Sequence, residues 1–313
     1  MEYVRLGKTD DTIPVIGMGT WKLGADKEGT IEAIRYGIGL GMSFVDTAEM
    51  YANEEIVGKA IQNEDVFIGT KVSPSHFREN EVLRACDASL GRLGVKTVDL
   101  YQLHWPNSRV TIKETMRAME KLVDQGKIRH IGVSNFNLKE LRAAQDAMKK
   151  HEIVSNQIEY SVLVRDFGDA LSDYCKKNGI TIIAYSPFGS GAFFDERYGN
   201  VHVILDDISK KHGKTAGQVA LNWLISKGNI SAIPKAGRLD HVEENAGATG
   251  WKLSPDEIKT IDSLGQSKTP IAGRLNAFTK RTAPFWSGIM TRIEHKRIKS
   301  GEEEKDENIM KRQ

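Results

Sequence analysis

Short apolar segments alternate with longer segments of helical spacing along most of the chain. The short segments are rich in β-branched residues and carry few polar positions, which is typical of strands buried on both faces of a parallel sheet. Eight of them are predicted as strands, over residues 15–19, 44–47, 66–71, 98–104, 128–134, 153–159, 181–186 and 230–235. The segments between them are predicted as helices, over residues 26–41, 53–62, 79–94, 111–126, 137–151, 167–179, 215–228 and 241–250. Eight repeats of strand and helix predict an α/β chain folded as a (β/α)8 TIM barrel, with a doubly wound sheet as the alternative.

Three glycines, Gly37, Gly39 and Gly41, stand close together at the end of the first predicted helix. A dinucleotide fingerprint needs the pattern GxGxxG directly after the first strand, at the start of a helix. The spacing and the place of these glycines differ from that pattern. We therefore interpret them as residues that end a helix and let it pack closely.

The charged residues divide the chain into two parts. Residues 266–313 carry 11 basic and 6 acidic side chains, whereas residues 1–265 carry 33 and 36. The alternation of strands and helices also ends near residue 265. A length of 313 residues is compatible with two domains, but a single barrel often exceeds about 250 residues. We predict one barrel over residues 1–265 and a C-terminal extension, with a charged tail, over residues 266–313.

Composition excludes several classes of protein. Of the residues, 40% are hydrophobic and 27% are charged, which is typical of a globular protein in water. The net charge of +2 argues against a partner that is nucleic acid, and no apolar run is long enough to span a membrane. Two cysteines, Cys86 and Cys175, and no N-terminal signal pattern predict a cytoplasmic protein without disulfides or a metal site.

Four polar side chains fall at the ends of consecutive predicted strands. Asp46 and Lys71 end the second and third strands, His104 ends the fourth, and Tyr51 lies in the loop after the second. Catalytic groups of such barrels come from the carboxyl ends of the strands. An ammonium held by a carboxylate can stabilise a phenolate, so that tyrosine can give a proton to a carbonyl oxygen or take one from an alcohol. Each residue alone has a structural explanation, but the four together favour catalysis.

The motifs around these residues resemble those of the aldo-keto reductase superfamily. They are SFVDTAEMY, GTK, YQLHWP and GKIRHIGVSNF, and the resemblance covers about residues 4–265. It implies a (β/α)8 barrel that reduces carbonyls with a nicotinamide cofactor, and it places the catalytic tetrad on Asp46, Tyr51, Lys71 and His104. The substrate implied is a small carbonyl compound or alcohol, and the chain is expected to be a monomer or a weak homo-oligomer.

The resemblance also implies a set of cofactor-binding residues. They are Thr20, Ser134, Asn135, Gln157, Tyr185, Ser186, Pro187, Phe188, Gly189, Lys235, Arg238, His241, Glu244 and Asn245. In the family, the serine–asparagine pair and the glutamine bind the carboxamide, and the tyrosine stacks on the ring. Two positions depart from the usual pattern for the 2′-phosphate, because Ala236 and His241 stand where the family commonly has serine and arginine. The matching residues Lys235, Glu244 and Asn245 imply NADP(H) as the cofactor, and the two departures leave NAD(H) open as a second.

The same resemblance implies the walls of a substrate pocket. Trp21 and Trp105 match aromatic positions at its mouth, and the loops over residues 76–80 and 189–200 are of the kind that set substrate choice. Residues 270–288 are expected to form the variable loop that covers the pocket. Two other functions stay open at this point. One is a regulatory subunit that binds the cofactor with little catalysis, and the other is an aldolase that forms a Schiff base on Lys71 or Lys235.

Overall fold

The structure is a computed structural model. It describes residues 1–23, 26–165, 167–189, 199–235 and 237–264, and the statements below concern these residues. The chain divides into two units, Met1–Lys268 and Thr269–Gln313, and the described residues all belong to the first. The expected pocket loop and charged tail lie outside the described residues, so the division at residue 265 stays a prediction.

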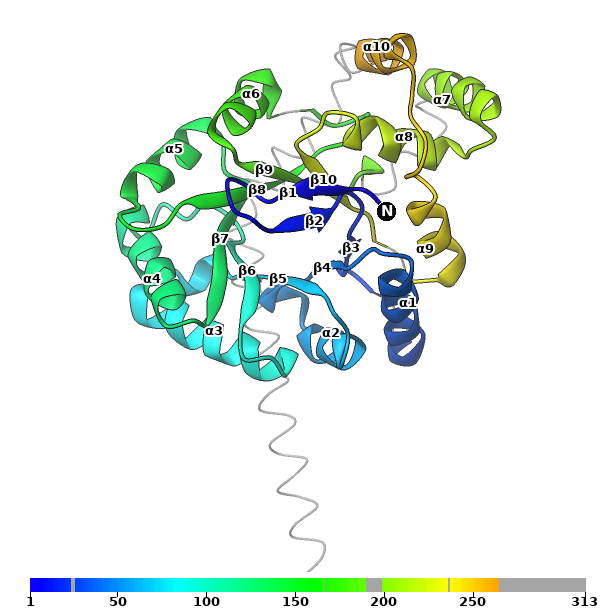
Figure 1. Ribbon diagram of the computed structural model, residues 1–313. Coiled ribbons are helices and arrows are strands. Elements are labelled where there is room, and N and C mark those ends of the chain that lie inside the picture. The colour runs from blue at the N-terminus through cyan, green and yellow to red at the C-terminus, as the bar shows by residue number, and fades with distance from the viewer. Residues whose placement is uncertain (24–25, 166, 190–198, 236, 265–313) are drawn as a thin grey trace, which may run out of the picture. The chain divides into compact units, whose positions relative to one another are not determined.

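Eight parallel strands form one sheet that closes into a barrel (Figure 1). They are β3 (Met18–Gly19), β4 (Phe44–Asp46), β5 (Phe67–Val72), β6 (Val98–Leu103), β7 (Ile128–Ser134), β8 (Ile153–Glu159), β9 (Thr181–Tyr185) and β10 (Ile230–Ile233). Strands that follow one another in the sequence are neighbours in the sheet. The first and last strands meet where the backbone N–H of Gly17 donates to Ala232 over 2.8 Å and that of Gly19 donates to Pro234 over 3.1 Å. The predicted (β/α)8 barrel is confirmed.

Helices follow the strands and surround the barrel (Figure 1). The eight predicted ones are present as α1 (Lys27–Gly39), α2 (Glu54–Ile61), α3 (Glu79–Leu93), α4 (Ile112–Asp124), α5 (Leu138–Ala147), α6 (Gly168–Asn178), α8 (Ala216–Ile225) and α9 (Leu239–Ala246). Two helices were not predicted, α7 (Gly199–His212) and α10 (Pro255–Leu264). They are joined by His212, whose Nε2 lies 3.0 Å from a carboxylate oxygen of Glu257. Two short 3-10 turns, η1 (Glu49–Tyr51) and η2 (Pro74–His76), follow β4 and β5, and the second shortens the expected loop over residues 76–80.

Local sequence signals explain several helix ends. The side chain of Asn137 accepts the backbone N–H of Glu140 over 3.0 Å, and the carboxylate of Glu140 accepts the N–H of Asn137, so that α5 begins with a capping box. Helix α3 ends at Gly94 in the left-handed conformation. A side chain on Gly37 would overlap Sδ of Met18, so this glycine lets α1 pack closely on β3. The interpretation is confirmed for Gly37, which packs closely, and for Gly41, whose φ of 88° follows the helix end, whereas a Cβ on Gly39 would meet no atom within 4 Å.

A hairpin of two short antiparallel strands, β1 (Tyr3–Arg5) and β2 (Thr12–Pro14), covers the amino end of the barrel (Figure 1). The sequence pattern did not predict it. Leu6 and Ile13 of this hairpin are fully buried and join the core inside the barrel, which contains Phe44, Leu100, Val154, Ile183 and Ile233. Arg129, at the start of β7, binds Asp11 between the two strands over 2.6 Å. The carboxyl ends of the strands are therefore the end at which a ligand can enter.

The two cysteines are buried on separate helices and are not bonded to each other. Burial raises the pKa of Cys86 on α3 and of Cys175 on α6 to about 12. A thiol of such high pKa holds little thiolate at neutral pH and is unreactive. In the part of the chain that the structure describes, no helix combines the length and the apolar character needed to cross a membrane.

Candidate active site

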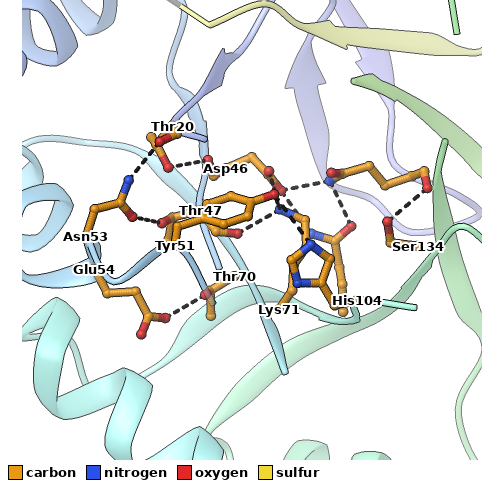
Figure 2. Close-up of polar contacts among 12 residues, drawn as sticks. Thr20, Asp46, Thr47, Tyr51, Asn53, Glu54, Thr70, Lys71, His104 and Ser134 are labelled. Carbon is orange, nitrogen blue, oxygen red and sulfur yellow. Dashed lines mark hydrogen bonds and ion pairs between the residues drawn. The ribbon is translucent and has the colours of Figure 1, made fainter. Parts of the chain in front are cut away.

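The four predicted catalytic side chains lie together at the carboxyl ends of β4, β5 and β6 (Figure 2). Asp46 is the last residue of β4, and Lys71 is the last but one of β5. His104 follows β6 directly, and Tyr51 ends the turn η1 in the loop after β4. Parallel strands of a barrel end on one rim, which is why residues far apart in the sequence meet here. The structure brings all four together, as the strand pattern predicted.

Lys71 is fully buried, and its ammonium group has three partners. Nζ lies 2.5 Å from Oδ2 of Asp46, 2.7 Å from the carbonyl oxygen of Thr47 and 3.4 Å from the hydroxyl of Tyr51. Burial lowers the pKa of Lys71, and the carboxylate of Asp46 opposes that shift. A buried charge is costly unless it is paired and hydrogen-bonded, and both conditions are met here. The three bonds fix the direction in which the ammonium meets Tyr51.

The hydroxyl of Tyr51 lies between two nitrogen atoms. It is 3.4 Å from Nζ of Lys71 and 3.5 Å from Nε2 of His104. Burial raises the pKa of Tyr51 well above its usual value, and the negative charge of Asp46 raises it further. These two effects set the direction of the shift, and the stabilisation of a phenolate by Lys71 stays a prediction. Tyr51 therefore keeps its proton at neutral pH.

His104 completes the group as a neutral imidazole. Burial lowers its pKa well below the usual value, and the positive charge of Lys71 adds to the shift. Its ring lies edge-on to that of Tyr51, with 5.4 Å between the ring centroids. Among the described residues, Nδ1 of His104 has no hydrogen-bond partner. The two rings can thus exchange or share a hydrogen bond without either of them carrying a charge.

Two buried glutamines hold the other side of Asp46. Its Oδ1 accepts one hydrogen bond from Nε2 of Gln102 over 3.0 Å and another from Nε2 of Gln157 over 2.8 Å. Gln102 was not singled out from the sequence. A signal was present, because Gln102 and the inward-facing Leu100 lie two residues apart on one strand and so share a face. A glutamine on the inner face of a buried strand is unusual and marks a polar site.

A second set of hydrogen bonds supports the loop that carries Tyr51 (Figure 2). Asn53, at the start of α2, accepts the hydroxyl of Thr47 over 2.8 Å and donates to the carbonyl oxygen of Thr20 over 2.7 Å. The predicted residue Thr20 is buried, and its own hydroxyl donates to the carbonyl oxygen of Asp46. Thr20 thus joins the ends of β3 and β4. Asn53 was not predicted as part of the site.

The residues expected to bind the carboxamide form a connected group beside His104. Nδ2 of Asn135 donates to the carbonyl oxygen of His104 over 3.1 Å and to Oγ of Ser134 over 3.0 Å, and its Oδ1 accepts the hydroxyl of Tyr185 over 2.8 Å. Ser134 donates to the backbone carbonyl of Gln157. Asn135 has a φ of 63°, a left-handed conformation that asparagine tolerates better than most residues. These bonds hold the ends of β7, β8 and β9 together beside the tetrad.

The model of the aldo/keto reductase family matches residues 15–266, which is most of the chain. The chain belongs to the aldo-keto reductase family. Its methylglyoxal reductase relative YeaE from Escherichia coli is 36% identical over 262 residues, 81% of this chain and 91% of that protein. The glyoxal reductase of Bacillus subtilis is 35% identical over 82% of this chain and 90% of its own length.

Solved structures agree with this family. The thermostable aldo-keto reductase Tm1743, solved with the inhibitor epalrestat, is 41% identical, with a TM-score of 0.80, and the match covers 85% of this chain and all of that one. An aldo-keto reductase from Klebsiella pneumoniae in complex with NADPH is 35% identical, with a TM-score of 0.78 over 86% of this chain and 97% of its own. These are oxidoreductases of the same fold, and neighbours among them bind NADP or NADPH.

The segment after β9 is described only as far as Gly189. Ser186 has a φ of 47° and accepts the backbone N–H of Gly189 over 2.8 Å, which makes a tight turn through Pro187 and Phe188. Gly189 itself has a positive φ that favours glycine. The following residues 190–198 lie outside the described residues. The turn places backbone groups at the rim of this aldo-keto reductase, and its contact with a pyrophosphate stays a prediction.

The predicted binding residues after β10 lie mostly on the surface. Arg238 is exposed, and its guanidinium binds the carboxylate of Asp240 over 2.6 Å. The side chain of His241 is exposed on α9, whereas Asn245 is buried on the same helix. The binding of a 2′-phosphate by Arg238 and His241 therefore stays a prediction. Ala236, one of the two departures from the family pattern, lies outside the described residues.

Lys235 and Glu244 connect this part of the aldo-keto reductase to its neighbours. Nζ of Lys235 donates to the carbonyl oxygen of Lys22 over 3.1 Å, which joins the loops after β10 and β3. The carboxylate of Glu244 accepts the hydroxyl of Thr215 over 2.6 Å and thereby joins α9 to α8. A phosphate that binds Lys235 would compete with the carbonyl oxygen of Lys22, and an adenine that binds Glu244 would compete with the hydroxyl of Thr215.

The two tryptophans flank the site at different levels of exposure. Trp105 follows His104 directly, is half-buried and lies nearly parallel to the imidazole, with 6.4 Å between the ring centroids. Trp21 follows Thr20, is 47% exposed, and carries Nζ of Lys22 over its ring at 4.5 Å. An exposed indole at a rim is free to contact a ligand. Their substrate roles stay predictions.

Proposed function

We propose that this aldo-keto reductase reduces small aldehydes, aldoses or ketones with NADPH, and that Tyr51 is the general acid. The observation that carries the proposal is the protonated hydroxyl of Tyr51 between Nζ of Lys71 and Nε2 of His104, at 3.4 and 3.5 Å. Two relatives act on methylglyoxal and glyoxal, which are small carbonyl compounds of this class. Neighbouring structures that hold NADP or NADPH support the choice of cofactor. NADH stays a second cofactor of this proposal.

The described residues fit a nicotinamide ring beside the tetrad. Buried amides of Asn135 and Gln157 and the hydroxyl of Ser134 supply hydrogen-bonding groups, and the half-buried ring of Tyr185 supplies an apolar face. Lys235 and Arg238 supply cations for a 2′-phosphate. When bound, NADPH supplies a hydride to the carbonyl carbon.

The tetrad supplies the proton. Tyr51 gives its proton to the carbonyl oxygen as that oxygen gains negative charge, and the phenolate that remains is stabilised by the ammonium of Lys71. Asp46 holds that ammonium in place. Neutral His104 orients the oxygen through Nε2 without competing for the proton, because its lowered pKa keeps it unprotonated. In alcohol oxidation the same groups act in reverse.

The aldolase alternative loses support at Lys71. A Schiff base requires a free electron pair on the nitrogen, but Lys71 has three acceptors, namely Asp46, Thr47 and Tyr51. Three bonds use all three protons of an ammonium group. The regulatory-subunit alternative is tested by turnover, because a subunit without catalysis would bind NADPH and not oxidise it.

The test is a Tyr51→Phe exchange in the full chain. We expect kcat for the reduction of methylglyoxal to fall by at least about 100-fold, since the proton donor is lost while its ring stays. NADPH affinity, measured by quenching of tryptophan fluorescence, should change by less than about threefold. Retained turnover in the variant would contradict the role of Tyr51. A wild-type chain that binds NADPH but reduces no aldehyde, aldose or ketone would favour the regulatory alternative.

A further inference from the structure

Gln102 lies inside the barrel, directly next to the residues of the site. It is fully buried on β6, opposite Lys71 of β5 on one side and Gly132 of β7 on the other. A Cβ on Gly132 would lie 2.9 Å from Cγ of Gln102, which is closer than such atoms pack. A glycine on the neighbouring strand therefore leaves the room in which this glutamine side chain lies.

The carboxylate of Asp46 determines which way both glutamine amides point. Oδ1 of Asp46 can only accept, so Gln102 and Gln157 must each turn an NH2 group toward it, at 3.0 and 2.8 Å. The oxygen of Gln102 then faces Gln157 and accepts its second N–H over 3.2 Å. The three side chains form a closed triangle of hydrogen bonds.

This triangle uses both N–H groups of Gln157. Among the described residues, no hydrogen bond to Oε1 of Gln157 is found, so the amide offers an acceptor and no donor. One hydrogen bond to Asp46 would act as a pivot and leave the amide plane free to turn. The second bond, to Gln102, fixes that plane and with it the position of Oε1.

We propose that Gln102 is a positioning residue, which fixes Gln157 so that it presents its oxygen to the carboxamide NH2 of the nicotinamide. This inference rests on the proposed function, because it concerns the same cofactor. Its consequence is selectivity for the carboxamide. A cofactor analogue that lacks that NH2 leaves Oε1 of Gln157 without a donor, and an unpaired buried acceptor weakens binding.

The experiment compares NADP⁺ with its 3-acetylpyridine analogue, in which a methyl group replaces the NH2, by fluorescence titration of the full chain. The wild type is expected to bind NADP⁺ about tenfold more tightly than the analogue. In Gln102→Met, an apolar exchange of similar length, the affinity for NADP⁺ should fall about fivefold while that for the analogue stays within about twofold. The ratio of the two dissociation constants should therefore approach about two or less.

The control is Ser155→Ala, in the same interior. Ser155 is fully buried beside Gly132, and its hydroxyl has no hydrogen-bond partner among the described residues, so its loss should leave the ratio unchanged. Gln102→Leu serves in place of the methionine variant if that one does not fold. The proposal is overturned if the wild type binds both compounds equally, or if a folded Gln102 variant keeps the wild-type ratio. A wild-type chain that binds neither compound contradicts the proposed function itself.

Discussion

The pKa values of two side chains of the site, Tyr51 and His104, are shifted in opposite directions, and both shifts keep the side chain neutral. Burial raises the pKa of Tyr51 and lowers that of His104, and each shift favours the neutral form. Lys71 is thus the one cation of the tetrad, and Asp46 stands against it over 2.5 Å. The pair of neutral rings can pass a proton to an oxygen without first being charged. At any pH between the ordinary pKa of histidine and that of tyrosine, neither residue gains or loses a proton.

The lowered pKa of His104 has a measurable effect on stability. An unfolded histidine binds a proton as the pH falls below about 6.5, whereas folded His104 does not, so unfolding takes up a proton. The free energy of unfolding should fall by about 1.4 kcal/mol per pH unit below about 6.5 from this residue alone. In His104→Asn, denaturant unfolding between about pH 6.5 and 5 should show a slope smaller by about that amount. His241→Asn, at an exposed histidine, is the control, and an unchanged slope in His104→Asn would contradict the shift.

At this scale the sequence predicted which residues meet but not how they ionise. Strand ends on one rim place Asp46, Tyr51, Lys71 and His104 together whatever their surroundings. The pKa of Tyr51 depends on how much water reaches the hydroxyl, and no spacing of residues contains that information. The contact that Lys71 needs to stabilise a phenolate is present, and the stabilisation itself stays a prediction.

Two asparagines begin helices in this chain and serve different purposes. Asn137 caps α5 through the backbone N–H of Glu140 and is exposed. Asn53 begins α2 but makes no cap; its buried amide instead joins Thr47 after β4 to Thr20 after β3. The same residue type at the same helix position thus supports a helix in one case and the rim of the site in the other.

Alanine exchanges separate these two purposes. Asn137→Ala should lower the free energy of unfolding by about 1 kcal/mol, the usual cost of a lost cap, and leave kcat unchanged. Asn53→Ala should cost about 2–3 kcal/mol, because two buried polar partners lose their bonds. It should also lower kcat about tenfold, since Asn53 holds the hydroxyl of Thr47, the residue whose carbonyl oxygen binds Lys71. Chemical denaturation and steady-state kinetics measure both effects, and equal kcat in the two variants would argue against a role of Asn53 in the site.

Most elements whose period was long enough to detect were predicted, and helices α7 and α10 were not. The eight barrel strands and their helices repeat often enough to establish the fold. The strands of the hairpin have three residues each, too few to show alternation. Helix α7 did carry a signal, because Val201, Leu205 and Ile208 are buried at helical spacing. It was not predicted because residues 189–200 have the composition of a loop, and the predicted loop therefore included the first two residues of the helix.

At the scale of the whole molecule, one end of the barrel is closed by structural contacts and the other end carries the predicted active site. The hairpin and the ion pair of Arg129 with Asp11 close the amino end, where no predicted site residue lies. The tetrad and the expected carboxamide-binding residues all lie at the carboxyl ends of the strands. We therefore expect specificity to come from the loops at that rim and from segments added to the barrel. The sequence could not identify the substrate, because loop composition alone does not give the shape of a pocket.

The predicted C-terminal extension, residues 266–313, is the longest such segment, and its removal tests its role. The unit Met1–Lys268 contains all ten described helices and every described strand, so a chain that ends at Lys268 should still fold. We expect its thermal unfolding midpoint to change by less than about 5 °C and its NADPH affinity by less than about threefold. The ratio of kcat/KM between methylglyoxal and an aldose should change by at least about tenfold, because residues 270–288 are predicted to cover the substrate pocket. An unchanged ratio would disprove that role, and a truncated chain that does not fold would place the end of the barrel beyond residue 268.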